Sequence, residues 1–115
     1  MTGHNETDIN FNEPEIYRCV IISNAHMREN DAVLLEKLSR NMEGEFGAFY
    51  WIDTTPGGFI LRVAASGDAP VLLREAGLSE DCCQIVTVLS EKLRADIIHF
   101  DQDGEELTGF PVHNW

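Results

Sequence analysis

The chain has 115 residues, 43% of them hydrophobic, and its 20 acidic against 8 basic residues give a net charge of -12. A chain of this length is expected to bury one sizeable core within one domain. No apolar stretch approaches the roughly 20 residues of a membrane helix, and the polar start has neither the basic nor the apolar region of a signal peptide. We therefore expect a cytoplasmic protein whose cysteines stay reduced.

The first predicted elements follow an acidic arm. Residues 1–15 show no hydrophobic period and are predicted to form a flexible arm, so that the domain spans 16–115. The sequence YRCVIIS over 17–23 is apolar and β-branched, which indicates a strand buried on both faces. Asn30 then suits the N-cap of a helix whose apolar residues recur at helical spacing as far as Met42.

A hairpin, two helices and a last strand come next. Strands are predicted over 46–53 and 58–64, on either side of a turn that contains Pro-Gly-Gly. A short helix is favoured over 69–76, a longer one over 80–93, and a final strand over 95–100. Typical capping residues mark the helix ends: Asp68 and Ser79 at the N-termini and Gly77 at a C-terminus.

The order strand, helix, strand, strand, helix, strand predicts an α+β fold. The commonest arrangement of such a βαββαβ chain is the ferredoxin-like split βαβ sandwich. We expect four antiparallel strands with two main helices on one face. The short helix is extra to that plan, and the other face of the sheet would be free for a partner.

Metal and cofactor sites are not predicted. Cys82 and Cys83 lie in an apolar helical pattern and are expected to be core residues. Their spacing from His99 and His113 matches no zinc motif, so one packed and one surface histidine are expected. The run from Asp101 resembles part of a calcium loop, but the first and twelfth positions would be a histidine and a phenylalanine.

Three polar residues at the end of the first strand form the only candidate for a reactive site. Ser23, Asn24 and His26 could supply a nucleophile and a base, but no nucleophile elbow surrounds the serine. The simpler interpretation is that these side chains satisfy backbone groups of the loop. An enzyme or ligand binder built on them is the hypothesis that we rank lowest.

Acidic residues near the end of the chain form the predicted partner-binding patch. Residues 95–115 contain no Lys or Arg, and their carboxylates would repel nucleic acid and membrane but attract a basic protein surface. The basic residues are scattered, so direct nucleic-acid binding is not expected. The predicted patch contains five residues: Asp96, Asp101, Asp103, Glu105 and Glu106.

Two tryptophans are candidates for an apolar interface. Trp51 lies in an aromatic run, and Trp115 follows a proline-containing stretch that we expect to dock onto the domain because tryptophan buries a large apolar area. A homodimer is compatible with such an interface.

Several short motifs resemble an uncharacterised domain family of small bacterial proteins that is associated with plasmids and prophages. The closing residues 110–115 are similar to that family's Leu-Pro-x-Phe-Asp-Trp ending, with departures at Phe110, His113 and Asn114, and Arg28 replaces a usual capping Ser or Thr. The remaining similarity lies in Ile22-Ser23-Asn24-Ala25-His26, Leu34-Leu35, Gly58-Phe59, Phe100-Asp101 and Asp103-Gly104. The resemblance implies a mobile-element context and no catalytic residues.

These observations favour a non-catalytic interaction protein. Small acidic proteins of phages and plasmids, such as anti-CRISPR and anti-restriction proteins, block host nucleic-acid-binding complexes by presenting carboxylates to a basic groove. Our leading hypothesis is an inhibitor of this kind. The alternative is an antitoxin, an adaptor or a self-assembling protein that uses an apolar face of the sheet.

Overall fold

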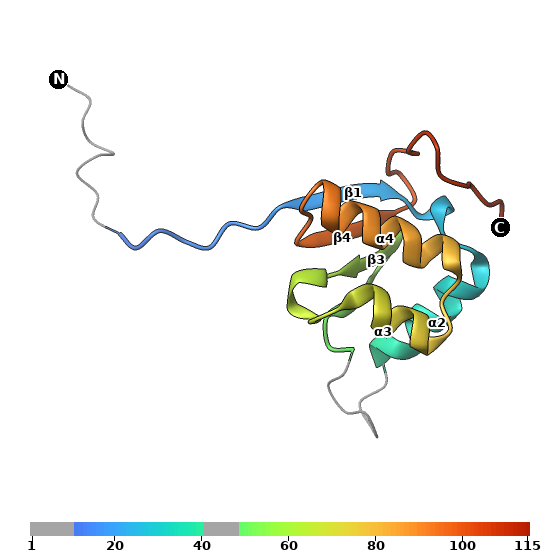
Figure 1. Ribbon diagram of the computed structural model, residues 1–115, viewed down its shortest axis with the longest axis horizontal. Helices are drawn as coiled ribbons and strands as arrows, with labels where there is room; N and C mark the ends of the chain where they lie inside the picture. The colour runs from blue at the N-terminus through green and yellow to red at the C-terminus, as the bar shows by residue number, and fades with distance from the viewer. Residues whose placement is uncertain (1–10, 41–48) are drawn as a thin grey trace.

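The computed structural model describes residues 11–40 and 49–115, which form three α-helices, two short 3-10 turns and one sheet (Figure 1). The order along the chain is β1 (Cys19–Ser23), η1 (Asn24–His26), α2 (Glu29–Arg40), β2 (Ile52–Thr55), β3 (Gly58–Leu61), η2 (Val63–Ala65), α3 (Ala69–Ala76), α4 (Glu80–Lys92) and β4 (Ile97–Asp101). The α+β class is confirmed. No helix of this described part is long and apolar enough to cross a membrane.

The sheet is mixed, with the strand order β1-β4-β3-β2. β1 runs parallel to β4, whereas β4–β3 and β3–β2 are antiparallel pairs. The expected sheet of four antiparallel strands is therefore wrong, and so is the ferredoxin-like arrangement. β4 lies inside the sheet and β1 at its edge.

The extra helix α3 explains this topology. A single helix after β3 would carry the chain back for a parallel strand, but α3 and α4 pack against each other and return it to the end of β3. There the amide of Ala64 donates to the carbonyl of Asp96 over 3.0 Å. β4 consequently starts beside the end of β3 and runs antiparallel to it.

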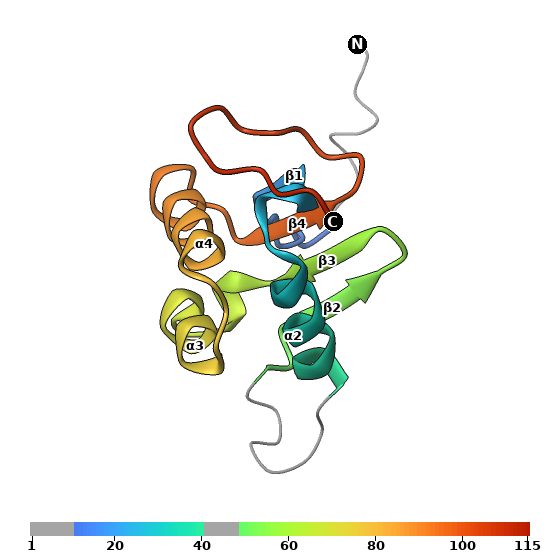
Figure 2. The ribbon, with the colours of Figure 1, turned by 90° about the vertical axis from the view of Figure 1, so that its right-hand side faces the viewer.

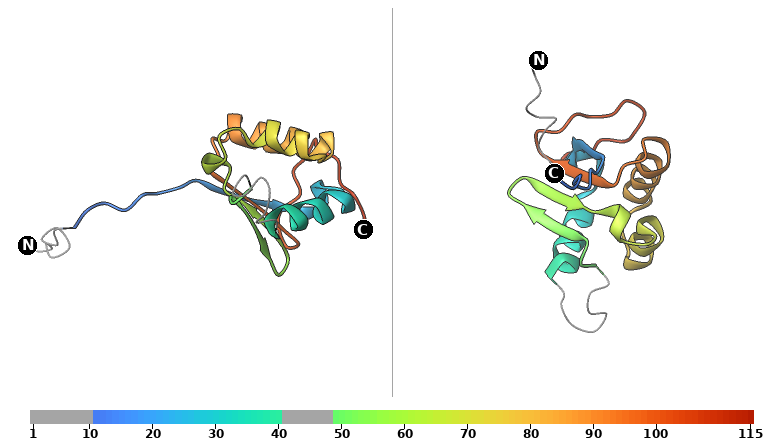
Figure 3. Two further views of the ribbon diagram at one scale, coloured as in Figure 1. Left: turned by 90° about the horizontal axis from the view of Figure 1, so that it is seen from below. Right: turned by 90° about the vertical axis from the view of Figure 1, so that its left-hand side faces the viewer.

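The helices cover one face of the sheet, and the core lies between the helices and that face (Figures 2 and 3). Ile22, Ile98 and Phe100 are at most 1% exposed on that face, and they pack with buried residues such as Leu35 and Leu73 of the helices. On the uncovered face Ile21 is 55% exposed. The prediction that the first strand is buried on both faces is therefore wrong, because helices cover only one side of this edge strand.

Local signals set most element ends. Asp68 and Ser79 accept hydrogen bonds at the N-termini of α3 and α4, and Gly77 ends α3 with a φ of 105°, so these predictions are confirmed. Asn30 lies inside α2, which begins at Glu29, so its predicted N-cap role is wrong.

The hairpin is shorter than expected. β2 and β3 pair from Ile52 with Leu61 to Thr55 with Gly58, and Phe49–Trp51 lead into β2 through a turn. Residues 46–48 of the predicted strand and Met42 of the predicted helix lie outside the described residues. Within the hairpin, Arg62 pairs with Asp53 at 3.3 Å.

The arm prediction is only partly covered by the structure. Residues 1–10 lie outside the described part, and residues 11–18 form no regular element and are exposed. They leave the domain in line with β1 (Figure 1). The flexibility of the arm and the boundary at residue 16 stay predictions.

Candidate functional site

The turn after β4 places a group of carboxylates at one end of the sheet. We call residues 101–106 the acidic turn; its acids are Asp101, Asp103, Glu105 and Glu106. The carboxylate of Asp101 accepts from the amide of Asp103 over 3.0 Å, and its carbonyl accepts from Gly104 over 3.0 Å. The amide of Ser23 donates to the carbonyl of Glu105 over 2.9 Å. These bonds hold the turn against β1.

A glycine is required for this close approach. A Cβ atom at Gly104 would lie 2.2 Å from the carbonyl oxygen of Ile22, a distance that no side chain can adopt without moving the backbone. The position of the acidic turn therefore depends on Gly104 as well as on hydrogen bonds.

Asp96 does not join the other four acids. It lies before β4, so about 16 Å of strand separates it from Asp101 at the usual rise per residue. Its carboxylate accepts from the amide of Arg18 over 2.9 Å. The structure thus brings four of the five predicted patch residues together and leaves Asp96 at the opposite end of the strand.

The carboxylates of the acidic turn lack the arginine partners that four acids elsewhere in the domain have. Four arginines pair with acids of the helices and the hairpin at 2.8–3.3 Å: Arg28 with Asp81, Arg40 with Glu36, Arg62 with Asp53 and Arg74 with Glu80. Among the described residues, no Lys or Arg pairs with the acidic turn. Asp103, Glu105 and Glu106 are exposed, and the one basic side chain near Asp101 in the described part is His99, whose Nε2 lies 3.7 Å from the carboxylate. The negative charge of this turn is therefore not neutralised locally.

Ser23, Asn24 and His26 hold backbone groups, as the simpler interpretation predicts. The hydroxyl of Ser23 accepts from the amide of Ala25 over 3.0 Å, and the amide of Asn24 donates to the carbonyl of Gly57 over 3.1 Å. His26 is only 1% exposed. Each of the three polar groups is thus engaged by the loop or by a neighbouring turn.

His26 connects the domain to residues 107–115, which we call the C-terminal segment. Its Nε2 accepts from the amide of Leu107 over 2.8 Å, so the proton of the neutral ring is on Nδ1, which lies 2.9 Å from the carbonyl of Pro111. The amide of His113 donates to the carbonyl of Ala25 over 2.8 Å. Sequence reasoning found this histidine but not its role, since its partners lie more than 80 residues away along the chain.

Asp31 is a second buried polar residue, and it was not singled out in the sequence analysis. It is 1% exposed, and its carboxylate accepts from the amide of Arg28, the amide of Ser79 and the hydroxyl of Ser79 over 2.6–2.8 Å. One carboxylate therefore joins the N-termini of α2 and α4. The signal in the sequence is an acid three residues after Arg28, the residue that precedes the helix.

The two tryptophans predicted to form an apolar interface differ in their exposure. Trp51 is fully buried in the core, so it offers no surface to a partner, and this part of the prediction is wrong. Trp115 is 52% exposed, and its indole donates to the carbonyl of Met27 over 2.9 Å. The C-terminal segment docks through hydrogen bonds rather than through burial of its tryptophan.

No metal-binding group of three or more His, Cys, Asp or Glu side chains exists within residues 11–40 and 49–115. Cys82 and Cys83 are buried, as predicted, and burial raises the pKa of both thiols. His99 is partly exposed, whereas His113 lies 3.1 Å from the carboxylate of Asp81.

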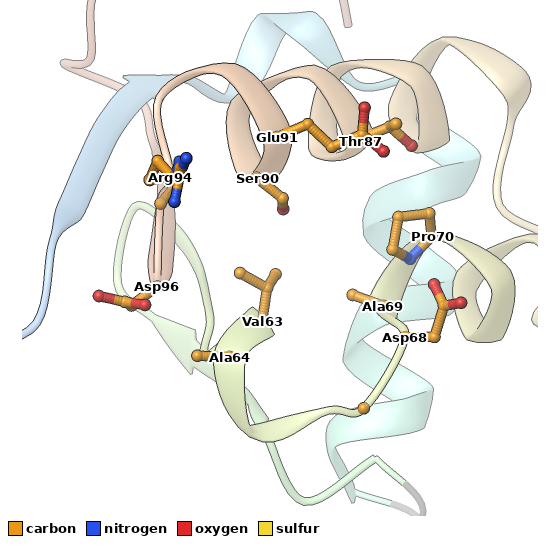
Figure 4. Close-up of a pocket in the computed structure, with 12 residues that line it drawn as sticks. Val63, Ala64, Asp68, Ala69, Pro70, Thr87, Ser90, Glu91, Arg94 and Asp96 are labelled. Atoms are coloured by element: carbon orange, nitrogen blue, oxygen red, sulfur yellow. The ribbon is translucent and has the colours of Figure 1, made fainter.

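A cavity of about 370 Å³ lies between α4 and the loop that leads into α3 (Figure 4). Ser90 and Thr87 line it from α4, opposite Val63 and Ala69, and the hydroxyl of Ser90 is buried without a hydrogen-bond partner among the described residues. Neither a histidine nor a cysteine of the described part lines the cavity. It therefore offers no nucleophile paired with a histidine base.

Comparison with known proteins agrees with the resemblance to an uncharacterised family. The model of a family of unknown function, described as the DUF5983 C-terminal domain, matches residues 19–115. Neither the curated proteins nor the solved structures contain a significant match. The matched stretch begins with β1 and contains both the acidic turn and the C-terminal segment, and the chain belongs to the DUF5983 family.

Proposed function

We propose that this chain is a non-catalytic interaction protein that binds a basic surface of a partner through the acidic turn. The observation that carries the proposal is the concentration of unpaired carboxylates in one turn. Arginines pair with four acids of the helices and the hairpin, while Asp103, Glu105 and Glu106 are exposed close together and have no Lys or Arg partner in the described part of the chain. Unpaired carboxylates are available to a cationic partner without first losing an internal ion pair.

The anchoring of the turn supports this function. Its backbone is bonded to β1 and to Gly57, so the carboxylates are presented on an ordered support. A partner then pays less conformational entropy to align its basic groups with them. Charge complementarity of this kind contributes mainly to association rate and specificity.

The finer proposal concerns the partner. A groove that binds nucleic acid is lined with Lys and Arg and tracks closely spaced phosphates, so a rigid acidic turn suits it. We propose a mobile-element inhibitor of a host nucleic-acid-binding complex, similar in principle to anti-CRISPR and anti-restriction proteins. The net charge of -12 supports this partner class.

A matched pair of variants tests the proposal. The variant Glu105→Gln/Glu106→Gln removes two charges from the acidic turn, and Glu75→Gln/Glu91→Gln removes two exposed charges from α3 and α4. Tagged proteins are used to capture partners from a bacterial extract at about 50 mM and about 500 mM NaCl, with double-stranded DNA as competitor. Partners are identified by mass spectrometry.

We expect a nucleic-acid-binding complex that is captured at low salt and displaced by DNA. The turn variant should lose most of this capture, and the helix variant should keep it. Equal capture by both variants would reject the acidic turn as the binding site. A partner that resists both salt and DNA would instead favour the antitoxin, adaptor or self-assembly alternative, for which the exposed Ile21 on the uncovered face is the specific observation.

A further inference from the structure

A groove lies between α2 and the hairpin, next to the acidic turn. It has a volume of about 390 Å³, and Gln102 of the acidic turn lines it together with Trp115. The amide of Gln102 donates to the carbonyl of Gly57 over 3.0 Å, so the hairpin turn and the acidic turn are joined at this point. The groove is therefore continuous with the surface to which the proposed function assigns a basic partner.

Trp115 supplies an aromatic ring to this groove. Its indole N–H donates to the carbonyl of Met27 over 2.9 Å, which holds the ring near the start of α2, two residues further along the chain. Trp115 is nevertheless 52% exposed, although a tryptophan normally buries a large apolar area. A ring that is held in place and still exposed is available for stacking by a cationic group.

One face of α2 forms a wall of the groove. Its lining residues recur at helical spacing and combine two carboxylates with two apolar side chains: Glu29, Ala32, Val33 and Glu36. Glu29 has no Lys or Arg partner among the described residues, and Glu36 pairs with Arg40 at 2.8 Å. An exposed pair of this kind is weak, so a partner can displace it. No basic side chain of the described part lines the groove.

These features fit the side chain of an arginine. The guanidinium group is planar, stacks on aromatic faces and pairs with carboxylates, while the aliphatic stem packs on apolar surface. Trp115 offers the aromatic face, Glu29 the carboxylate, and Val33, which is 46% exposed, the apolar surface. The partial positive charge at the start of α2 opposes a cation, so the carboxylate of Glu29 is needed there. The ammonium of a lysine is more strongly hydrated and gains less from the ring.

We propose that the basic partner places an arginine side chain in this groove, stacked on Trp115 and paired with Glu29. The inference rests on the proposed function, because it assigns a second contact to the same partner. The acidic turn would attract the partner through its charge, and the groove would select arginine over lysine.

An NMR titration of the full chain with a hexa-arginine peptide tests the groove. The chain has two tryptophans and therefore two indole N–H signals. The signal of Trp115, assigned with Trp115→Phe, should shift, and that of the buried Trp51 should stay in place. A hexa-lysine peptide should bind at least about threefold more weakly. Trp115→Leu should abolish this preference, because leucine has no aromatic face.

A matched pair of variants tests the carboxylates. Glu29→Gln/Glu36→Gln removes two charges from the groove and should weaken binding of hexa-arginine at least about fivefold. Glu75→Gln/Glu91→Gln is the control, since it removes two exposed charges from α3 and α4 and leaves the same net charge. It should change binding less than about twofold, because its sites are far from the peptide and screened by salt.

Two results would overturn the groove as a binding site: a Trp115 signal that hexa-arginine leaves unshifted, or equal weakening by the two pairs of substitutions. Equal binding of both peptides to the wild-type chain would overturn the assignment to arginine. The proposed function fails separately. If Glu105→Gln/Glu106→Gln captures the partner as the wild type does while hexa-arginine still shifts the Trp115 signal, the groove stands and the acidic turn is rejected.

Discussion

The covered face of the sheet and the C-terminal segment are both held on the domain, but by different interactions. Ile22, Ile98 and Phe100 are buried among residues of the helices, and hydrophobic contact holds them there. In the C-terminal segment Trp115 is half exposed and Leu107 and Phe110 are only partly buried, and directional hydrogen bonds to His26 and to loop carbonyls hold the segment in place. Periodic apolar residues set the fold, whereas a few polar atoms place the segment, so substitutions in the two regions should act differently.

The largest expected effect is in the core. Phe100→Ala removes a fully buried ring and should lower the free energy of unfolding by about 3–5 kcal/mol. Phe110→Ala, in the C-terminal segment, removes a partly buried ring and should cost about 1–2 kcal/mol. Urea unfolding of both variants gives the two values. Equal losses would show that the segment contributes to the core as much as β4 does.

The next largest loss of stability is expected for Asp31→Ala. It leaves the amides of Arg28 and Ser79 and the Ser79 hydroxyl without their buried acceptor, which should cost about 2–4 kcal/mol. Glu29→Ala is the control, because this exposed acid lies in the same helical turn. Thermal and urea unfolding measure both variants, and a similar loss for the two would contradict the role of Asp31 at the helix junction.

His26→Phe should act mainly on the C-terminal segment. The ring is of similar size but offers neither an acceptor to Leu107 nor a donor to Pro111, so a cost of about 1–2 kcal/mol is expected. Hydrogen exchange should show faster exchange at the amides of Leu107 and His113, with little change at Ile98. His99→Phe is the control. Unchanged exchange at Leu107 would reject His26 as the anchor of the segment.

The smallest expected effect on stability comes from the cysteine thiols. Cys19 is exposed and should react rapidly with Ellman's reagent, whereas Cys82 and Cys83 should react only after unfolding. Burial raises the pKa of Cys82 well above its usual value of 9.0. The folded state then keeps this proton while the unfolded state loses it, so stability is retained below pH 9 and falls above it. Two fast thiols in the native protein, or stability that rises from pH 9 to pH 10, would contradict this.

Much of the fold followed from local patterns. The capping residues Asp68 and Ser79, the end of α3 at Gly77, the hairpin turn and the buried pair Cys82–Cys83 were all predicted correctly, because each depends on neighbours within a few residues. The candidate site was only partly predictable. Four acids of the patch share one turn, since they are close in sequence, but Asp96 is separated from them by the length of a strand.

The amino-acid sequence by itself determined the α+β class, the element ends that have local caps, and the excess of acids near the C-terminus. Only the tertiary structure decided the strand order, the burial of Trp51 and the roles of His26 and Asp31. The bonds of His26 to Leu107 and Pro111 and those of Asp31 to Ser79 join residues that are 48 to 85 positions apart. Such contacts depend on how α3 and α4 return the chain to the sheet, and no local spacing encodes that path.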